Sequence, residues 1–118
     1  MKIVIQRVKS AELFVENKFY SKIGFGLMVL VAISKEDKKE DINWIANKLV
    51  NLRIFNDENN QMNLSVTDVE GDLMIVSQFT LYASTKKGNR PSFIQSASGK
   101  FAEKVYLDFD DIFGNFVP

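Results

Sequence analysis

The sequence predicts a single compact α+β domain with two main helices. Its length of 118 residues suits one domain, and residues 1–118 contain no repeat, low-complexity tract or linker that would divide it. Hydrophobic residues make up 46% and charged residues 25%, which is the mix typical of globular proteins. Short runs rich in Ile and Val lie between turn signals, and two longer segments carry apolar residues at helical spacing.

The strands are predicted from apolar runs. Residues 2–8 alternate in part and are rich in Ile and Val, whereas residues 27–33 and 73–76 are continuously apolar, as in central strands buried on both faces. The remaining predictions are a hairpin of residues 11–16 and 19–23 turning near Asn17 and Lys18, a polar loop at 56–60, an extended piece at 62–66 and a turn at 68–72.

Two helices are predicted. The first covers residues 37–52, where Ser34 three residues before Asp37 resembles a weak capping box. The second begins near Ser98 and ends near Gly114. The apolar positions that repeat at helical spacing are Ile42, Ile45, Ala46, Leu49 and Val50 in the first helix, and Phe101, Ala102, Val105, Tyr106 and Phe109 in the second.

Composition excludes several kinds of chemistry. The chain has no Cys and no His, so disulfides, thiolate catalysis, a Ser-His-Asp triad and a histidine-ligated zinc are ruled out. No acidic cluster is spaced for a cation, so no metal and no cofactor are expected. Fifteen basic residues balance fifteen acidic ones, which disfavours a broad nucleic-acid-coating surface and leaves contact through a local patch open.

No contact with a membrane is expected either. The longest apolar run, residues 27–33, is too short to cross a bilayer. Gln6 and Arg7 interrupt the N-terminal region where a signal peptide would need its apolar stretch, so a cytoplasmic location is expected.

A first candidate site is the polar sequence Ser77-Gln78-Phe79-Thr80 at the end of a predicted central strand. If the strand continues, Ser77 and Phe79 face one side and the other two residues face the opposite side. The four residues form a hydroxyl-and-amide site with an oxyanion hole of backbone N–H groups, or they simply end the strand. The residues alone favour the second interpretation, because no base is present to activate a hydroxyl.

Three further features each allow two interpretations. Lys86, Lys87 and Arg90 form a basic loop that could hold phosphates or could simply be a solvated turn. Arg7, within an apolar strand, is a paired buried cation, a substrate contact, or an outward-facing surface residue with a packed stem, and the residues alone favour the last. Met62 lines a base-stacking pocket or belongs to the core.

Six short motifs occur in one order along the chain, and together they resemble a known family. That family is the D-aminoacyl-tRNA deacylases of the D-Tyr-tRNA deacylase type, and the resemblance runs from Met1 to about Asp111. The motifs are I-Q-R-V at 5–8, G-x-G-L-x-V-L at 24–30, R-I-F at 53–55, M-N-L at 62–64, V-S-Q-F-T-L at 76–81 and R-P-S-F at 90–93.

The resemblance implies an enzyme that hydrolyses the ester of D-aminoacyl-tRNA, and of mischarged glycyl-tRNA, as translation quality control. It implies a homodimer acting at the tRNA 3′ acceptor end without metal or cofactor, and a largely antiparallel, barrel-like sheet core. Thr80 is then a nucleophile, or the protein positions the substrate while the terminal ribose 2′-hydroxyl assists. We favour the second role, with the Phe79 and Thr80 amides steadying the oxyanion. The implied residues are Ser77, Gln78, Phe79 and Thr80 for catalysis, and Arg7, Met62, Lys86, Lys87, Arg90 and Pro91 for substrate binding.

The sequence departs from the family pattern after the second predicted helix. The family's N-x-G-P-V-T strand, which excludes L-amino acids, is absent, since Pro91 follows Arg90 and Pro118 follows Val117. The chain is therefore C-terminally short relative to the family. Three explanations stand: a truncated product, a diverged relative with another device against L-amino acids, or a non-catalytic relative. The last would bind the tRNA acceptor end or only oligomerise.

Overall fold

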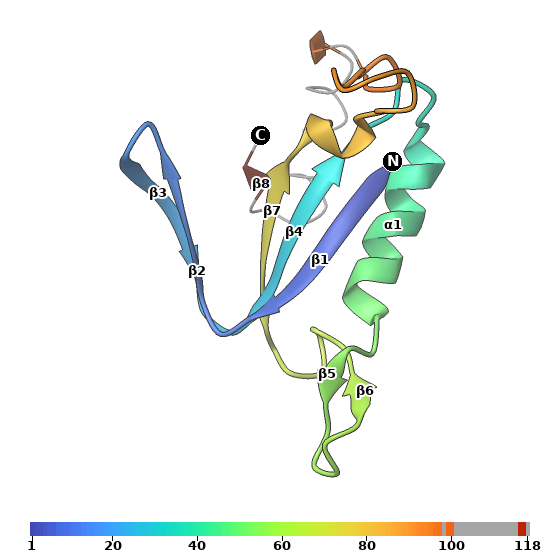
Figure 1. The fold of residues 1–118 in the computed structure, drawn as a ribbon. Coiled ribbons are helices and arrows are strands. Elements are labelled where there is room, and N and C mark those ends of the chain that lie inside the picture. The colour runs from blue at the N-terminus through green and yellow to red at the C-terminus, as the bar shows by residue number, and fades with distance from the viewer. Residues whose placement is uncertain (98, 101–115, 118) are drawn as a thin grey trace.

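The computed structural model describes residues 1–97, 99–100 and 116–117 (Figure 1). A four-stranded sheet, one α-helix and two separate two-stranded hairpins make up the described part of the chain. Sheets combined with a helix agree with the predicted α+β class. The elements are β1 (Lys2–Val8), β2 (Ala11–Val15), β3 (Lys18–Ile23), β4 (Gly26–Ala32), α1 (Lys39–Asn51), β5 (Phe55–Asn56), β6 (Met62–Leu64), β7 (Asp72–Ser77), the 3-10 helix η1 (Phe79–Tyr82) and β8 (Phe116–Val117).

The main sheet has the strand order β1-β4-β7-β8 and is open rather than a closed barrel within the described residues. Only the β1–β4 pairing is antiparallel, and the β4–β7 and β7–β8 pairings are both parallel. The expectation of a largely antiparallel, barrel-like core is therefore wrong for this sheet. The physical reason is the long connection between β4 and β7, which contains α1 and returns the chain to the same end of the sheet.

The hydrophobic core lies between α1 and one face of the sheet (Figure 1). Alternate residues of β4, namely Leu27, Val29 and Val31, are at most 1% exposed and point to this face. Ile42 and Leu49, one face of α1, are each 1% exposed. Each of these side chains stabilises the fold by about 1.5–3 kcal/mol through burial.

The helix α1 begins two residues later than predicted. The Asp41 carboxylate accepts the Lys38 backbone N–H at 2.8 Å and so satisfies a donor at the helix start. The Ser34 and Asp37 pattern forms a separate turn instead, in which the Asp37 carboxylate accepts the Ser34 N–H at 2.7 Å. The other oxygen of that carboxylate pairs with the Met1 ammonium at 2.7 Å, which ties the start of β1 to this turn.

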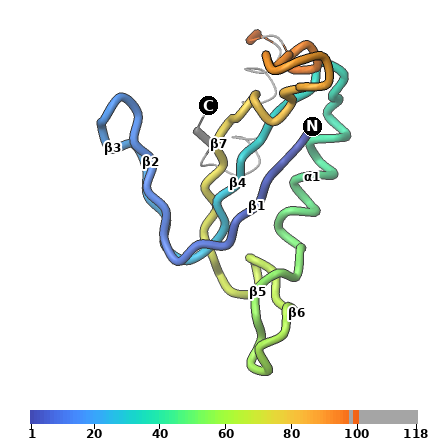
Figure 2. The backbone as a smooth tube through the Cα atoms, in the orientation of Figure 1, coloured from blue at the N-terminus to red at the C-terminus, as the bar shows by residue number. Residues whose placement is uncertain are grey.

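The β2–β3 hairpin stands away from the body of the molecule (Figure 2). Its two-residue turn is Glu16 and Asn17, with φ of 51° and 64°, one residue earlier than the predicted turn. Two successive positive φ angles give a type I′ turn, whose twist matches that of the strands. Phe14 and Phe19 pair edge to face across the hairpin at 6.0 Å and are 55% and 60% exposed.

The prediction of two main helices is not supported, because the described residues outside α1 contain only Gly99 and Lys100 in α-helical conformation. The predicted second helix falls almost entirely on residues 98 and 101–115, which lie outside the described part.

Candidate functional site

The candidate site begins where β7 ends. The Gln78 N–H extends the β4–β7 ladder by donating to the Val31 carbonyl at 2.7 Å, and the chain then turns into η1. The strand therefore does not continue beyond Ser77, so the alternation expected for these four residues in a continued strand does not arise. Ser77 and Gln78 are half-buried, whereas Phe79 and Thr80 are exposed at the surface.

The turn into η1 leaves two backbone donors available. In a 3-10 helix each N–H bonds three residues back, so the first N–H groups have no partner within the element. The Leu81 N–H donates to the Gln78 carbonyl at 3.3 Å, whereas the Phe79 and Thr80 N–H groups meet no acceptor among the described residues. Adjacent unpaired donors of this kind can stabilise negative charge on a substrate oxygen.

A segment distant in the sequence packs against η1. The Ser96 hydroxyl donates to the Phe79 carbonyl at 3.1 Å, and the rings of Phe79 and Phe93 meet edge to face at 5.2 Å. This segment is itself anchored to the sheet, because the Ala97 N–H donates to the Ile33 carbonyl at 2.9 Å. Two contacts from this one segment, a hydrogen bond and a ring contact, thus hold Phe79 in position.

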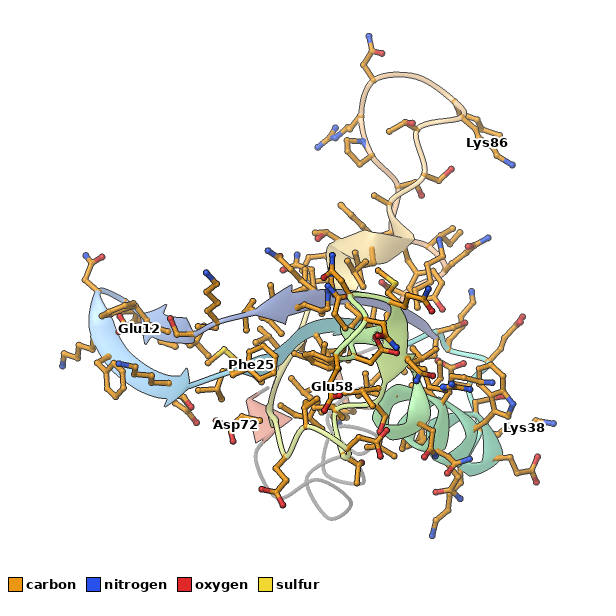
Figure 3. The ribbon with its side chains drawn as sticks, turned by 90° about the horizontal axis from the view of Figure 1, so that it is seen from below. Glu12, Phe25, Lys38, Glu58, Asp72 and Lys86 are labelled. Carbon is orange, nitrogen blue, oxygen red and sulfur yellow. The ribbon has the colours of Figure 1, made fainter. Side chains whose placement is uncertain are left out.

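The basic loop rises from the same end of the molecule. Ser84 and Ser92 exchange two backbone hydrogen bonds of 2.8 Å, which close the loop at its base. Figure 3 shows Lys86 on this loop, extended away from the body. All four predicted loop residues are exposed, and no carboxylate lies within ion-pair distance of the loop cations in the described part of the chain. These four residues are Lys86, Lys87, Arg90 and Pro91.

Arg7 and Met62 lie elsewhere. In the strand register, Arg7 of β1 lies opposite Leu27 of β4, and Ser77 of β7 lies opposite Val31 of β4. Leu27 and Val31 are four residues apart, which is about 13 Å along β4. The Arg7 guanidinium donates to the Ile54 carbonyl at 2.9 Å. Met62, 62% exposed, lies in the β5–β6 hairpin at the end opposite η1 (Figure 1). Within this chain the structure does not bring these two residues to the candidate site.

Tyr82 is the group at this end with a shifted pKa. Burial raises the pKa of its hydroxyl, and the Asp37 carboxylate raises it further. The Lys2 ammonium lies 4.8 Å from the centre of the Tyr82 ring and adds a cation to this end. The Tyr82 hydroxyl therefore keeps its proton at neutral pH.

The two other groups with shifted pKa values, Asp57 and Asp68, lie in the turns on either side of β6. The Gln61 N–H lowers the pKa of Asp57, and the Ser65 N–H lowers the pKa of Asp68, each by stabilising the carboxylate. Both carboxylates hold turns next to β6 and have no part in the site.

Sequence comparison identifies the family. The model for D-Tyr-tRNA(Tyr) deacylase matches residues 4–115. This chain belongs to that family. The D-aminoacyl-tRNA deacylase of Thermosipho africanus (strain TCF52B) is 52% identical over 116 residues, which cover 98% of this chain and 78% of that protein. The deacylase of Clostridium novyi (strain NT) is 50% identical over 112 residues, covering 95% of this chain and 75% of that protein.

Solved structures agree with this assignment to the D-Tyr-tRNA deacylase family. A structure named c-Myc DNA unwinding element binding protein has a TM-score of 0.89 at 38% identity, covering 96% of this chain and 76% of its own. A probable eukaryotic D-amino acid tRNA deacylase has a TM-score of 0.82 at 23% identity, covering 94% and 65% respectively, and shows the same fold. The predicted family resemblance is confirmed.

Two residues of the site are not among the predicted ones. Phe93 and Ser96 contact Phe79 across more than a dozen residues of sequence. The R-P-S-F motif contains Phe93 and could have suggested it, whereas no sequence signal marks Ser96. Neither a metal ligand group of three or more His, Cys, Asp or Glu nor a helix able to cross a membrane occurs in the described residues.

Proposed function

We propose that this protein hydrolyses the ester bond of D-aminoacyl-tRNA and releases the D-amino acid and free tRNA. The reaction serves translation quality control and extends to mischarged glycyl-tRNA. The observation that carries the proposal is that the N–H groups of Phe79 and Thr80, two exposed residues beside a cationic loop, meet no acceptor among the described residues. About half the residues are identical in relatives named D-aminoacyl-tRNA deacylase, which supports the same activity here.

The chemistry assigned to the site is substrate positioning with oxyanion stabilisation. Water adds to the ester carbonyl carbon, the carbonyl oxygen takes up negative charge, and the bond to the ribose oxygen then breaks as that oxygen gains a proton. Loss of one oxyanion donor costs roughly 3–4 kcal/mol in enzymes that use such donors. Residues 73–102 contain no Asp, Glu or His, so a protein base for the attacking water is absent from this segment. The substrate's own 2′-hydroxyl is proposed to assist.

The proposal includes a homodimer in the cytoplasm that meets the tRNA at its 3′ acceptor end. The proposed cytoplasmic location follows from the substrate, because aminoacyl-tRNA is used where translation takes place. A dimer is supported by exposed apolar side chains that a second copy would cover. On the β2–β3 hairpin and on the edge strand β1 these are Val4, Phe14, Val15, Phe19 and Tyr20.

The proposal is tested by hydrolysis of D-Tyr-tRNA and L-Tyr-tRNA by this chain, measured side by side. Release of free tRNA from the D-ester, with the L-ester spared, is expected. Hydrolysis of both esters at equal rates would support the ester chemistry and contradict the selectivity. Hydrolysis of neither by a folded sample that still binds tRNA would support the non-catalytic alternative.

A further inference from the structure

The stretch of chain that carries η1 and the basic loop has only basic charged residues although the whole chain is neutral, and Asp37, the carboxylate near Tyr82, is paired with the Met1 ammonium. Residues 73–102 contain no acidic residue, whereas the chain as a whole has fifteen. The cations in this stretch are Lys86, Lys87, Arg90 and Lys100, and Lys2 reaches the same end by donating to the Leu81 carbonyl at 3.4 Å. Such a local field attracts the phosphates of a nucleic acid without any net charge on the protein.

Two aromatic rings lie exposed at the base of the cationic loop. Phe79 is 56% and Phe93 is 37% exposed, although each buries an edge or a face against the other. Phe93 directly follows Ser92, which closes the loop with Ser84. Phe93 follows Arg90 by three residues, which span at most about 10 Å. The Phe79 ring adjoins that of Phe93, so the two rings and the loop cations are within reach of one short single strand.

We infer that the Phe79–Phe93 pair is a stacking surface for an unpaired base of the tRNA 3′ end, with phosphates held by the loop cations. The inference rests on the proposed function and deepens it. Charge complementarity decides the occupant: a flat apolar surface beside cations suits a nucleobase attached to phosphates. An apolar protein partner would leave the loop cations unpaired. The consequence is a preference for acceptor ends with a single-stranded tail over blunt helices.

The decisive variant is Phe93→Leu, which keeps apolar bulk against Phe79 and removes the aromatic face. Phe93 is used rather than Phe79, because the amide of Phe79 belongs to the proposed oxyanion site. Phe25→Leu is the matched control, since Phe25, directly before β4, is 51% exposed and also packs its ring against another, that of Phe55. Phe93→Trp restores a stacking face and is the rescue variant.

Binding is measured by fluorescence anisotropy with an uncharged acceptor-stem RNA that carries a 3′ single-stranded tail, and with its blunt counterpart. For the tailed RNA we expect Phe93→Leu to weaken affinity about tenfold, which corresponds to ~1.4 kcal/mol and lies within the range for one stacked base. Phe25→Leu and Phe93→Trp are expected to bind like the wild type. In turnover, Phe93→Leu is expected to raise KM and preserve kcat.

Equal affinity of Phe93→Leu and wild type for the tailed RNA, with both proteins folded by circular dichroism, would overturn the inference. A loss shared by Phe25→Leu, or a loss for blunt and tailed RNA alike, would also overturn it. The binding assay needs no turnover. A wild type that prefers the tailed RNA through Phe93 and hydrolyses no ester would therefore contradict the proposed function while supporting the stacking surface.

Discussion

Thr80 illustrates how the surroundings of a single hydroxyl limit its chemistry. The Gln78 side-chain amide donates to the Thr80 hydroxyl oxygen, so the group meets a hydrogen-bond donor. A nucleophilic hydroxyl needs an acceptor for its proton, and without one it is a weak nucleophile. The backbone N–H of the same residue has no acceptor in the part of the chain that the structure describes, and it is assigned to a substrate oxygen. Thr80 thus contributes its amide to the proposed reaction.

Thr80→Ala tests this division between the hydroxyl and the amide. The substitution keeps the amide and removes the hydroxyl, so kcat for D-Tyr-tRNA is expected to stay within about tenfold of the wild type. Rapid-quench measurement of tRNA release gives kcat, with Thr85→Ala, an exposed threonine of the basic loop, as the matched control. Complete loss of turnover in a folded Thr80→Ala protein would make the hydroxyl essential and contradict the amide role.

Among the elements, the parallel pair β4 and β7 places the site, because Ser77 and Gln78 leave the sheet beside Val31. The start of this pairing depends on Gly26. A Cβ at Gly26 would lie 2.0 Å from the Asp72 carbonyl oxygen, far closer than any real contact. The absence of a side chain at this position therefore permits β7 to approach β4.

Gly26→Ala is expected to destabilise the protein by at least ~2 kcal/mol, since two backbone segments must separate. Urea unfolding followed by circular dichroism measures the change in the free energy of unfolding. Gly24→Ala is the control, because a Cβ there would meet the Asp72 carboxylate at an ordinary 3.6 Å. An unchanged midpoint for Gly26→Ala would show that the β4–β7 pairing does not need this close approach.

At the scale of the whole molecule, acidic and basic residues are unevenly distributed along the chain although their charges sum to zero. Residues 73–102, which include η1 and the basic loop, contain no Asp or Glu, and the acidic residues all belong to the rest of the sequence. A binding end of this kind releases counterions from nucleic acid as a more basic protein does, with a small number of phosphate contacts.

With about three phosphate contacts, KM for D-Tyr-tRNA is expected to rise up to ~20-fold between 50 and 200 mM salt. Lys87→Glu is expected to raise KM at low salt more than it lowers kcat, and to flatten the salt dependence. Lys18→Glu, at the tip of the β2–β3 hairpin, is the charge-matched control. A KM that Lys87→Glu leaves unchanged would exclude the basic loop from substrate binding.

Much of the fold could be predicted from local patterns. The apolar runs predict β1, β4 and β7, and the apolar stripe predicts α1 to within two residues at its start. These predictions succeed because a helix buried on one face carries apolar residues at helical spacing, whereas a strand buried on both faces is a continuous apolar run. The order of six motifs likewise sufficed to indicate the family, which the comparisons confirm.

The features of the fold and site that could not be predicted depend on contacts between segments far apart in the sequence. The parallel direction of β4 and β7 depends on how the chain returns after α1, and no residue within either strand encodes it. The departure of Phe79 and Thr80 from the strand, and the contact of Phe79 with Phe93, depend on hydrogen bonds and ring packing between segments far apart in sequence. Local composition therefore decided which residues are strands, helix and reactive groups, whereas tertiary packing decided which of them meet.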